Sequence, residues 1–310
     1  MTTLATPRPR GTFGAIRRPR RGLRSLRGIQ GMRRATQAAV ALAILAIALA
    51  RTFSTTGGGP AGATTPEALC PFGGIETIGT FIATGGYVPH VHAANLVLAV
   101  ALLLVAFFAR GAFCGWICPL GFLQDLTSGF GRIVKKRVPP VRRAVRALQI
   151  RARGLARLDR PLRLLKYAVL AWAVLGAAYF GLMVFRDVDP WIALLDLGRE
   201  SAGFGLLVLG ILLVASFFVD RPWCRYACPL GAANGIVARL SPVFLRRDVA
   251  ACVDCTACSR ACPMGLPVAT ALKITSVDCT GCLECVEACP REGALELAVG
   301  MPISFGRAAH

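Results

Sequence analysis

The stretch Cys252-Val-Asp-Cys255-Thr-Ala-Cys258-Ser-Arg-Ala-Cys262-Pro263 is followed by a second stretch of the same design, Cys279-Thr-Gly-Cys282-Leu-Glu-Cys285-Val-Glu-Ala-Cys289-Pro290. Both copies have the spacing C-x2-C-x2-C-x3-C-P. Three thiolates at this spacing can bind three corners of an iron–sulfur cube. The pattern therefore predicts iron–sulfur chemistry in the C-terminal part of the chain.

The order of the cysteines also predicts how they divide between two clusters. In two-cluster proteins with this pattern, the fourth cysteine of each copy binds the cluster of the other copy. Zinc and disulfide bonds are the structural alternatives, since C-x2-C pairs also bind zinc. Two complete copies, each with its proline, favour iron–sulfur clusters. We predict two [4Fe–4S] clusters, one bound by Cys252, Cys255, Cys258 and Cys289, the other by Cys279, Cys282, Cys285 and Cys262.

The composition indicates a membrane protein with a small soluble domain. The chain has 310 residues, of which 55% are hydrophobic, and a mean hydropathy of +0.58. This is too apolar for an ordinary soluble domain of that length. Thirteen cysteines would suggest disulfides in a secreted protein, but cluster thiolates require a reducing compartment. We therefore expect the C-terminal domain to face the cytoplasm.

The net charge of +20 raises nucleic acid as a partner, but the distribution of the charges argues against it. Residues 1–34 contain ten arginines and no acid, and residues 110–166 contain fourteen Lys and Arg against two acids. Residues 249–301, in contrast, carry three basic residues against six acids. Basic segments beside apolar runs are typical of cytoplasmic loops in membrane proteins. We expect contact with anionic membrane lipid and no nucleic-acid partner.

Four apolar runs predict four transmembrane helices, at residues 35–50, 93–109, 167–185 and 204–219. The first run is near the minimum length of a span, and its arginine-rich lead also allows a cleaved signal peptide. The scarcity of charge in residues 51–92 predicts an external loop. The first and third spans then run outward and the other two return. This predicts a multi-pass protein of the bacterial cytoplasmic (inner) membrane with both termini in the cytoplasm.

These observations divide the chain into four parts. We expect a basic cytoplasmic tail at residues 1–34, a membrane α-helical domain at 35–240, a small α+β domain at 241–301 and a C-terminal tail at 302–310. Residues 138–166, between the two helix pairs, are basic with interspersed apolar residues. They predict either an amphipathic helix on the inner leaflet or a solvated helical linker.

A second cysteine motif, C-x3-C-P-L-G, follows the second and the fourth predicted span. It reads Cys114-Gly-Trp-Ile-Cys118-Pro-Leu-Gly and Cys224-Arg-Tyr-Ala-Cys228-Pro-Leu-Gly. The matched positions indicate that the membrane domain is an internal repeat of two helix pairs. Cysteines four apart on a helix share one face, so the two pairs can supply four thiolates to an additional cluster or a thiophilic metal. Redox thiols and buried packing are the alternatives.

A third group of candidate residues lies in the expected external loop. Cys70, Glu76, His90 and His92 form a candidate outer-side site for quinol or for a metal ion. Histidine can accept protons or bind metal at such a position. The alternative is that the histidines are ordinary surface residues and that Cys70 is inert.

The motifs and their order resemble those of the NapH-type membrane quinol dehydrogenases, which belong to a wider class of polyferredoxin membrane proteins. The likeness extends over about residues 35–300 and includes the four apolar runs, both C-x3-C-P motifs and the double bacterial 2[4Fe–4S] ferredoxin pattern. It implies that the motifs and clusters face the cytoplasm and that electrons come from the quinol pool. It also implies a redox role for Cys114, Cys118, Cys224 and Cys228. The long arginine-rich N-terminus departs from the family pattern.

Together these features predict an integral-membrane electron-transfer component of a quinol dehydrogenase, with no catalytic side chain assigned. It would pass electrons between quinol or quinone and a redox partner protein. Two alternatives use the same residues, namely a maturation factor that reduces copper and a redox-sensing membrane scaffold. The chain has no phosphate-binding glycine loop, hydrolase nucleophile elbow or dinucleotide fingerprint.

Overall fold

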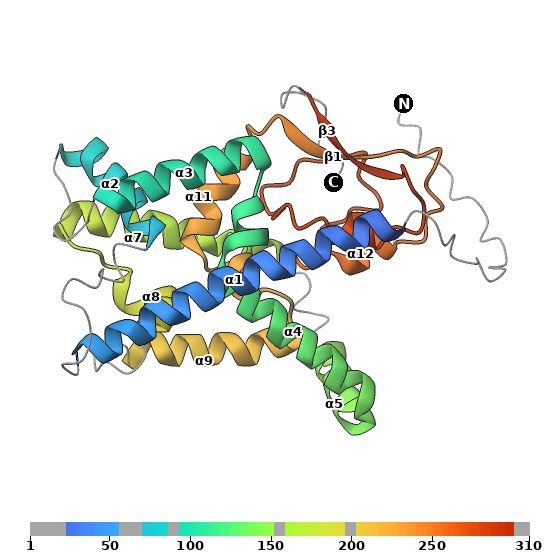
Figure 1. Ribbon diagram of the computed structural model, residues 1–310, viewed down its shortest axis with the longest axis horizontal. Helices are drawn as coiled ribbons and strands as arrows, with labels where there is room; N and C mark the ends of the chain where they lie inside the picture. Colours follow the sequence, from blue (N-terminus) through green and yellow to red (C-terminus); the bar gives the residue numbers. More distant parts are fainter. Residues whose placement is uncertain (1–22, 56–69, 86–92, 152–158, 196–202, 301–310) are drawn as a thin grey trace.

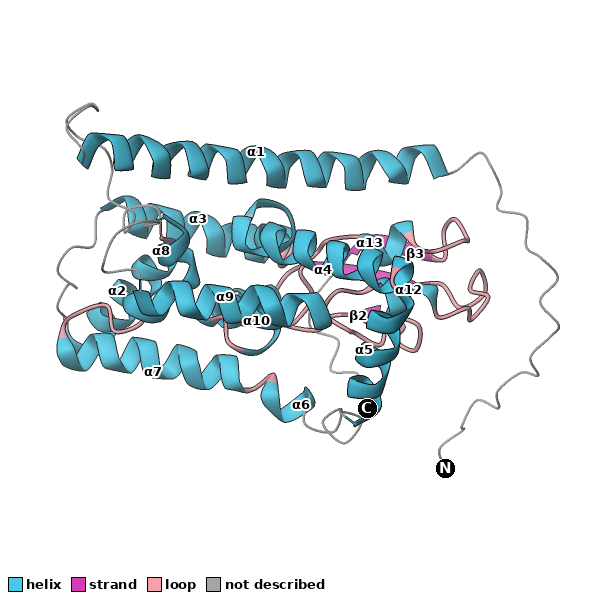
Figure 2. Cartoon of the chain, turned by 90° about the horizontal axis from the view of Figure 1, so that it is seen from below, coloured by secondary structure: helices cyan, strands magenta, loops and turns pink. Residues whose placement is uncertain are grey.

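The computed structural model describes residues 23–55, 70–85, 93–151, 159–195 and 203–300. Helices make up the described chain as far as residue 238, and a small sheet with two short helices follows. The bundle of helices lies at one end of the molecule and the sheet at the other (Figure 1). Helix α1 (Leu23–Thr55) runs alongside both parts (Figure 2).

All four predicted apolar runs are largely helical. They lie in α1, α3 (Ala93–Ala109), α7 (Leu165–Phe180) and α9 (Gly203–Phe218), with the predicted third run ending five residues beyond α7 and the fourth one residue beyond α9. By length and composition, Ile29–Ala50 in α1 is the one segment of the described chain that can cross a membrane. Helices α3, α7 and α9 have 16 or 17 residues, fewer than the roughly 20 that a bilayer ordinarily requires. The four-span topology therefore stays a prediction.

Residues 71–84, which we expected in an external loop, instead form helix α2 (Pro71–Thr84). Pro71 stands in the first turn, where its missing N–H leaves no hydrogen bond unmade. Helix α2 packs against α3 and α7. The contact with α3 is close, because a Cβ on Gly74 would lie 2.3 Å from the carbonyl oxygen of Asn95. The loop prediction was wrong for these residues because scarcity of charge does not distinguish a loop from an apolar helix that packs on its neighbours.

The two C-x3-C-P-L-G segments connect equivalent pairs of helices. The first follows α3 and leads through a π-helical turn, η2 (Phe113–Ile117), into α4 (Pro119–Arg137). The second follows α9 and leads through α10 (Pro222–Tyr226) into α11 (Pro229–Ala238). Helix α4 packs against α9, and α11 packs against α3. Each repeat therefore places its last helix on the apolar helix of the other repeat.

The basic segment 138–166 does not continue as one helix to its end. The structure contains α5 (Pro139–Arg151) and the single turn α6 (Asp159–Leu162), and a further turn at residues 163–164 separates α6 from α7. Lys166 is buried inside α7. The prediction of an amphipathic helix as far as Lys166 was wrong, because the last basic residues pack against the C-terminal domain. Two short elements, η4 (Arg186–Val188) and α8 (Pro190–Leu195), precede α9.

The C-terminal domain is α+β, as predicted. Its strands β1 (Val243–Arg247), β2 (Lys273–Ile274) and β3 (Leu295–Val299) form an antiparallel sheet in the order β2-β1-β3. Leu245 in the central strand pairs with Ile274 on one side and Leu297 on the other. Helices α12 (Ala257–Ala261) and α13 (Glu284–Glu287) each carry a cysteine of the double pattern. The core beneath the sheet contains Leu245, Cys258, Met264, Leu266, Val268, Ile274, Cys285 and Leu295.

Residues 23–34, expected as part of a basic tail, form the first turns of α1. Gln30 and Arg33 are buried there. Helix α1 contacts α4 and η2 of the helical core and α13 of the C-terminal domain. The arginine-rich segment therefore includes part of the contact between the two parts of the molecule.

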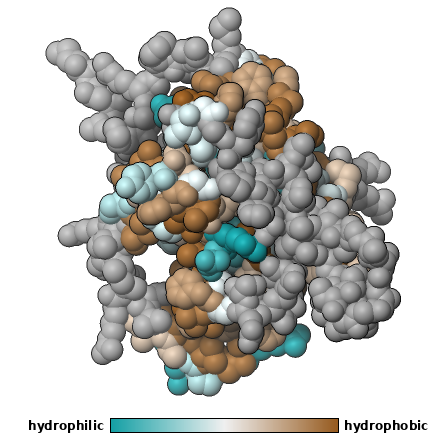
Figure 3. Space-filling model, turned by 90° about the vertical axis from the view of Figure 1, so that its left-hand side faces the viewer, coloured by the Kyte–Doolittle hydropathy of each residue, from teal (hydrophilic) through white to brown (hydrophobic). Residues whose placement is uncertain are grey.

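Large apolar side chains cover much of the outer surface of the bundle. Leu96, Val97, Val100, Leu104 and Phe108 are exposed on α3, and similar residues are exposed on α7 and α9. Figure 3, which looks onto the end of the bundle, shows mostly hydrophobic residues among those described. An apolar surface of this extent is far larger than the isolated exposed residues of ordinary soluble proteins.

Candidate iron–sulfur sites

The first predicted cluster set surrounds one pocket. Its four cysteines line an open pocket of about 350 Å³ at the outer side of the C-terminal domain. The backbone of the loop turns inward through two residues with left-handed conformation, Asp254 (φ 50°) and Thr256 (φ 57°). These turns on either side of Cys255 bring successive thiols to the same pocket. The cysteines of this set are Cys252, Cys255, Cys258 and Cys289.

The second set surrounds a separate pocket of about 340 Å³. The backbone repeats the geometry of the first loop, because Gly281 (φ 60°) and Leu283 (φ 59°) flank Cys282 as Asp254 and Thr256 flank Cys255. The structure thus groups the eight cysteines into the two sets predicted from their order, including the exchange of the fourth cysteine. The second set is Cys262, Cys279, Cys282 and Cys285.

These sulfur sets are suited to iron–sulfur clusters. Burial raises the pKa of the Cys279 and Cys282 thiols, while nearby arginines partly oppose the shift. A protonated thiol must lose its proton to bind metal, so assembly of a cluster would release protons. Four soft donors around a pocket this size match the ligand number of a [4Fe–4S] cluster. Ligation by the individual cysteines stays a prediction.

The C-x3-C-P cysteines occupy equivalent positions in the two repeats. Cys114 lies in the π-helical turn and Cys224 in α10, whereas Cys118 and Cys228 are the N-cap residues of α4 and α11. Both N-cap cysteines have extended backbone, with ψ of 115° and 111°. The prediction that each pair shares one face of a continuous helix was wrong, because a proline disfavours helical conformation in the residue before it.

All four C-x3-C-P cysteines nevertheless line one pocket of about 540 Å³, which we call the four-cysteine pocket. Three of the sulfurs accept hydrogen bonds: Cys114 from Asn234 Nδ2 at 3.3 Å, Cys224 from Gln124 Nε2 at 3.4 Å and Cys228 from the Gly231 N–H at 3.2 Å. Such hydrogen bonds stabilise thiolate ligands and tune cluster potentials. Burial raises the pKa of the Cys114 thiol to about 11. The donor set therefore fits an additional cluster.

The four-cysteine pocket adjoins the second ferredoxin pocket. Met264, Cys279 and Thr280 line both. Backbone approaches backbone at this junction, since a Cβ on Gly115 would lie 2.3 Å from the carbonyl oxygen of Thr280. The indole N–H of Trp116 donates a hydrogen bond to the carbonyl of Gly281 at 3.0 Å. The loop of the second set is thus docked directly on the π-helical turn that carries Cys114.

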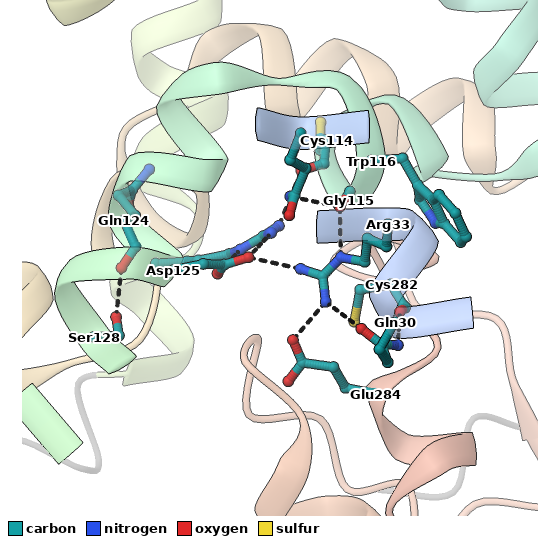
Figure 4. Close-up of polar contacts among 12 residues, drawn as sticks. Gln30, Arg33, Cys114, Gly115, Trp116, Gln124, Asp125, Ser128, Cys282 and Glu284 are labelled. Carbon is teal, nitrogen blue, oxygen red and sulfur yellow. Dashed lines mark hydrogen bonds and ion pairs between the residues drawn. The ribbon is translucent and has the colours of Figure 1, made fainter. Parts of the chain in front are cut away.

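A buried ion-pair network, not predicted from the sequence, joins the helical core to the C-terminal domain (Figure 4). Arg33 in α1 donates to Asp125 Oδ2 in α4 and to Glu284 Oε1 in α13, each at 2.6 Å. Its Nε donates to the carbonyl of Gly115 at 2.8 Å. Arg221 forms a two-pronged pair with the same Asp125, at 2.7 and 2.6 Å. We call Arg33, Asp125, Arg221 and Glu284 the arginine–carboxylate network.

The pKa of Asp125 follows from these contacts. Burial favours its neutral form, but the charge of Arg221 and then that of Arg33 outweigh burial and hold the pKa below its ordinary value. A second set of pairs lies nearby, in which Arg163 and Lys166 bind Asp278 while Arg225 binds Asp159. Asp125 and Asp159 are the two acids among fourteen basic residues in 110–166. Their isolation in a basic segment was the signal that could have revealed both networks.

The structure places part of the predicted outer-side site. Cys70 and Glu76 are buried, and a third residue, Asp189, accepts a weak hydrogen bond from the Cys70 thiol at 3.9 Å. Neither carboxylate oxygen of Glu76 has a hydrogen-bond partner within the described ranges. His90 and His92 lie outside the described residues. Among the residues that the structure describes, no three Cys, His, Asp or Glu side chains are placed to hold one metal ion.

Aromatic rings connect this buried group to the four-cysteine pocket. Phe72 contacts Phe185 edge to face, with 5.5 Å between ring centroids. Phe185 stacks with Trp223 at 6.2 Å. Trp223 lines the four-cysteine pocket. A continuous packed path thus leads from the neighbourhood of Cys70 to Cys224.

Comparison with known families agrees with these sites. Residues 91–137 and 201–248 each match the family described as 4Fe-4S binding domain, and residues 244–290 match the 4Fe-4S dicluster domain. YccM of Escherichia coli, whose name refers to electron transport, is 33% identical over 78% of this chain and 66% of its own length. The methylamine utilization ferredoxin-type protein MauN of Methylorubrum extorquens is 31% identical over 68% of this chain and 70% of its own. No solved structure gives a significant match.

Two domain matches that each contain one C-x3-C-P motif, followed by a dicluster domain, define an iron–sulfur protein of electron transport. The ferredoxin-type protein NapH of Haemophilus influenzae is 29% identical over 62% of this chain and 63% of its own length. The chain belongs to the NapH-type family of ferredoxin-type proteins.

Proposed function

We propose that the protein transfers electrons between the quinol pool and a redox partner through three iron–sulfur sites. Two are the ferredoxin pockets, and the third is the four-cysteine pocket. The observation that carries this proposal is the sharing of Met264, Cys279 and Thr280 between the second ferredoxin pocket and the four-cysteine pocket. Groups bound in adjacent pockets with common walls lie within reach of direct electron transfer.

The third site is supported by its donors. Each match to the 4Fe-4S binding domain contains only two of the cysteines, and the fold brings the two pairs to one pocket. Bound clusters would supply one-electron redox chemistry, which amino-acid side chains of this kind do not supply by themselves. The chain's own residues hold the sulfurs and donate hydrogen bonds to them through Gln124, Asn234 and Gly231.

The exposed apolar faces support a location in the bacterial inner membrane. Leu207, Ile211 and Val214 are exposed on α9, and large apolar residues are likewise exposed on α3. Lipid would cover these faces without any further protein. We propose that the bundle is embedded in the bilayer with the C-terminal domain on its cytoplasmic side, where thiols stay reduced. Local thinning of the bilayer accommodates helices of this length.

We propose that quinol is the electron donor and that it binds close to the buried residues Cys70, Glu76 and Asp189. Oxidation of quinol to quinone releases two protons and two electrons. Glu76 and Asp189 can accept protons there, and the path through Phe185 and Trp223 leads to the four-cysteine pocket, where the electrons would be accepted. The unpaired carboxylate of Glu76 is the feature that favours this end of the bundle.

Anaerobic purification tests the proposal. We expect about twelve iron atoms per chain, four for each cluster, and reduction of the clusters by a quinol analogue, followed by EPR. Cys224→Ser should lower the iron content by about a third, whereas Cys70→Ser should leave it unchanged because Cys70 lies in none of the three pockets. About eight iron atoms in the native protein would contradict the third site. Full iron content without any response to quinol would contradict the proposed donor.

A further inference from the structure

Arg221 stands at the joint between α9 and the second cysteine motif, and its backbone is strained. Its φ of 49° and ψ of 54° are left-handed, and its side chain is fully buried. The left-handed conformation is unfavourable for a non-glycine residue, because its Cβ lies too close to the following carbonyl oxygen. Such strain persists where surrounding contacts hold the residue in place. The contacts of the Arg221 side chain are therefore expected to hold it in this conformation.

The guanidinium of Arg221 is held close to the first cysteine motif. Besides its pair with Asp125, it donates a hydrogen bond through Nη1 to the carbonyl of Cys114 at 3.0 Å. Its charge also acts on the thiols of Cys224 and Cys282, which belong to the four-cysteine pocket and to the second ferredoxin pocket. The charge of Arg221 is thus felt by cysteines of both sites.

A second arginine provides a comparison. Arg110 stands at the equivalent joint after α3, also with left-handed backbone (φ 58°), and is buried. It donates to the carbonyls of Val243 and Ser276 at 3.1 and 3.2 Å, and its charge acts on the thiol of Cys279. The thiol on which its charge acts is therefore a predicted ligand of the second ferredoxin set.

We propose that Arg221 is a positioning residue shared by the four-cysteine site and the second ferredoxin site, where its fixed charge stabilises the reduced state of both. The inference rests on the proposed function, since it requires clusters in these pockets. An electron added to a buried cluster is stabilised by a nearby positive charge in surroundings of low dielectric constant. Arg221 raises both reduction potentials together, so neither site becomes a trap for the electron. Asp125 holds the guanidinium in place and moderates its field.

The test is an EPR-monitored redox titration of the purified full-length protein, with iron counted in each sample. The EPR signal of the four-cysteine site is assigned with Cys224→Ser, and that of the second ferredoxin site with Cys282→Ser. We expect Arg221→Met to lower the midpoint potentials of both sites. Arg221→Lys keeps the positive charge, so its potentials should lie close to the native values. Arg110→Met should lower only the potential of the second ferredoxin site. Arg132→Met serves as the control, because Arg132 forms an exposed pair with Asp220.

Asp125→Asn supplies a potential shift of the opposite sign, and it is compared only in samples with full iron content because loss of this carboxylate also weakens the junction of α1, α4 and α10. Removing this negative charge should shift both potentials upward, opposite to the effect of Arg221→Met. Shifts of the same sign in the two variants, or unchanged potentials at full iron content, would overturn the inference. If the Arg221→Met protein loses iron, the midpoint potentials of Arg221→Lys and Asp125→Asn test the inference instead. Near-native potentials in Arg221→Lys and higher potentials in Asp125→Asn support it, whereas unchanged potentials in Asp125→Asn at full iron content overturn it. A native protein with fewer than about twelve iron atoms contradicts the proposed third cluster instead.

Discussion

Gly115 is a residue at which the helical core closely approaches the C-terminal domain. Its α-carbon faces the Thr280 carbonyl and the backbone of Cys282, so no side chain can be placed there without moving the ferredoxin loop. The carbonyl of Gly115 accepts hydrogen bonds from Arg33 and Gln37 of α1. Free carbonyls of this kind are a consequence of the π-helical turn. One glycine thus connects α1, the C-x3-C motif and the second ferredoxin loop.

Gly115→Ala should displace that loop and destabilise the protein. We expect a loss of about 1–3 kcal/mol in the free energy of unfolding, as for other overpacked sites, together with a lower iron content at the second ferredoxin site. Thermal unfolding and iron analysis measure the two effects. Gly31→Ala, on the same side of the molecule in α1, is the matched control because a Cβ there meets no atom within 4 Å. If Gly115→Ala and Gly31→Ala had the same stability and iron content, the explanation by close backbone contact at Gly115 would be contradicted.

At the residue scale, the cysteines were predictable and the arginines were not. The eight cysteines of the double pattern and the four of the C-x3-C-P motifs carry their function in their spacing, because ligand geometry requires it. Arg33 is one of ten arginines in residues 1–34. Nothing in the local sequence distinguishes it, since its partners Asp125 and Glu284 are far away along the chain.

Helix α1 acts as a brace between elements that are distant in the sequence. Gln30 donates to the carbonyl of Cys282 at 2.8 Å, so α1 holds the ferredoxin loop as well as the π-helical turn. Asp125 of α4 connects this helix to the start of α10, because it accepts from both Arg33 and Arg221. Loss of that carboxylate would leave two buried arginines competing for the remaining acceptors.

Asp125→Asn should therefore destabilise the junction of α1, α4 and α10. Removing one member of a buried ion pair costs about 3–5 kcal/mol, and both arginines here are 2% exposed or less. Asp220→Asn removes an exposed pair with Arg132, for which the expected cost is about 0–1 kcal/mol. Denaturant or thermal unfolding of the two variants compares them directly. A similarly small loss of stability in both variants would contradict the role of Asp125 in joining α1, α4 and α10.

The same carboxylate predicts a dependence of stability on pH. Because the folded protein holds the pKa of Asp125 below its ordinary value, the unfolded chain binds a proton there more readily than the folded one. Its contribution is complete at neutral pH, begins to fall near the ordinary carboxyl pKa and is lost as the pH drops through the lower folded pKa. Unfolding measured across acidic pH should show a smaller dependence in Asp125→Asn than in the native protein. An unchanged dependence would contradict the assigned shift.

Elements were predictable where their apolar character is continuous. The runs that form α1, α3, α7 and α9 are recognisable because almost every residue is apolar. Helix α2 was missed because the low charge of residues 51–92 was interpreted as an external loop. Its close contact with α3 at Gly74 exists only in the folded protein. Likewise, Arg163 and Lys166, the last basic residues of segment 138–166, were expected to contact lipid, but in the folded protein they form ion pairs with Asp278.

The whole molecule presents an apolar bundle at one end and a polar, cysteine-rich domain at the other. Substitution of an exposed apolar residue distinguishes lipid from water as the surroundings of the bundle. Leu104→Asp on α3 should be costly in a bilayer, by about 2.5–3.5 kcal/mol near the helix centre, and nearly neutral in water. Leu104 is 52% exposed, and Leu272 in the C-terminal domain is 60% exposed.

We expect Leu104→Asp to reduce the amount of protein that remains in the membrane fraction after alkaline washing, while Leu272→Asp has no such effect. Unfolding in a bilayer mimic should show the same difference between the variants. Equal tolerance of both substitutions would argue that α3 faces water. This measurement therefore tests the proposed membrane location without reference to redox activity.

The sequence by itself determined the twelve cysteines, their division into sets and the apolar helices, because spacing and hydrophobicity are properties of neighbouring residues. Only the tertiary structure decided that the two C-x3-C pairs, which the repeat allowed to meet, do form one pocket, that this pocket shares lining residues with the second ferredoxin pocket, and that Arg33 and Arg221 both pair with Asp125. Those relations depend on which helices pack together. Packing is determined by the shape and charge of surfaces that meet only after the chain has folded.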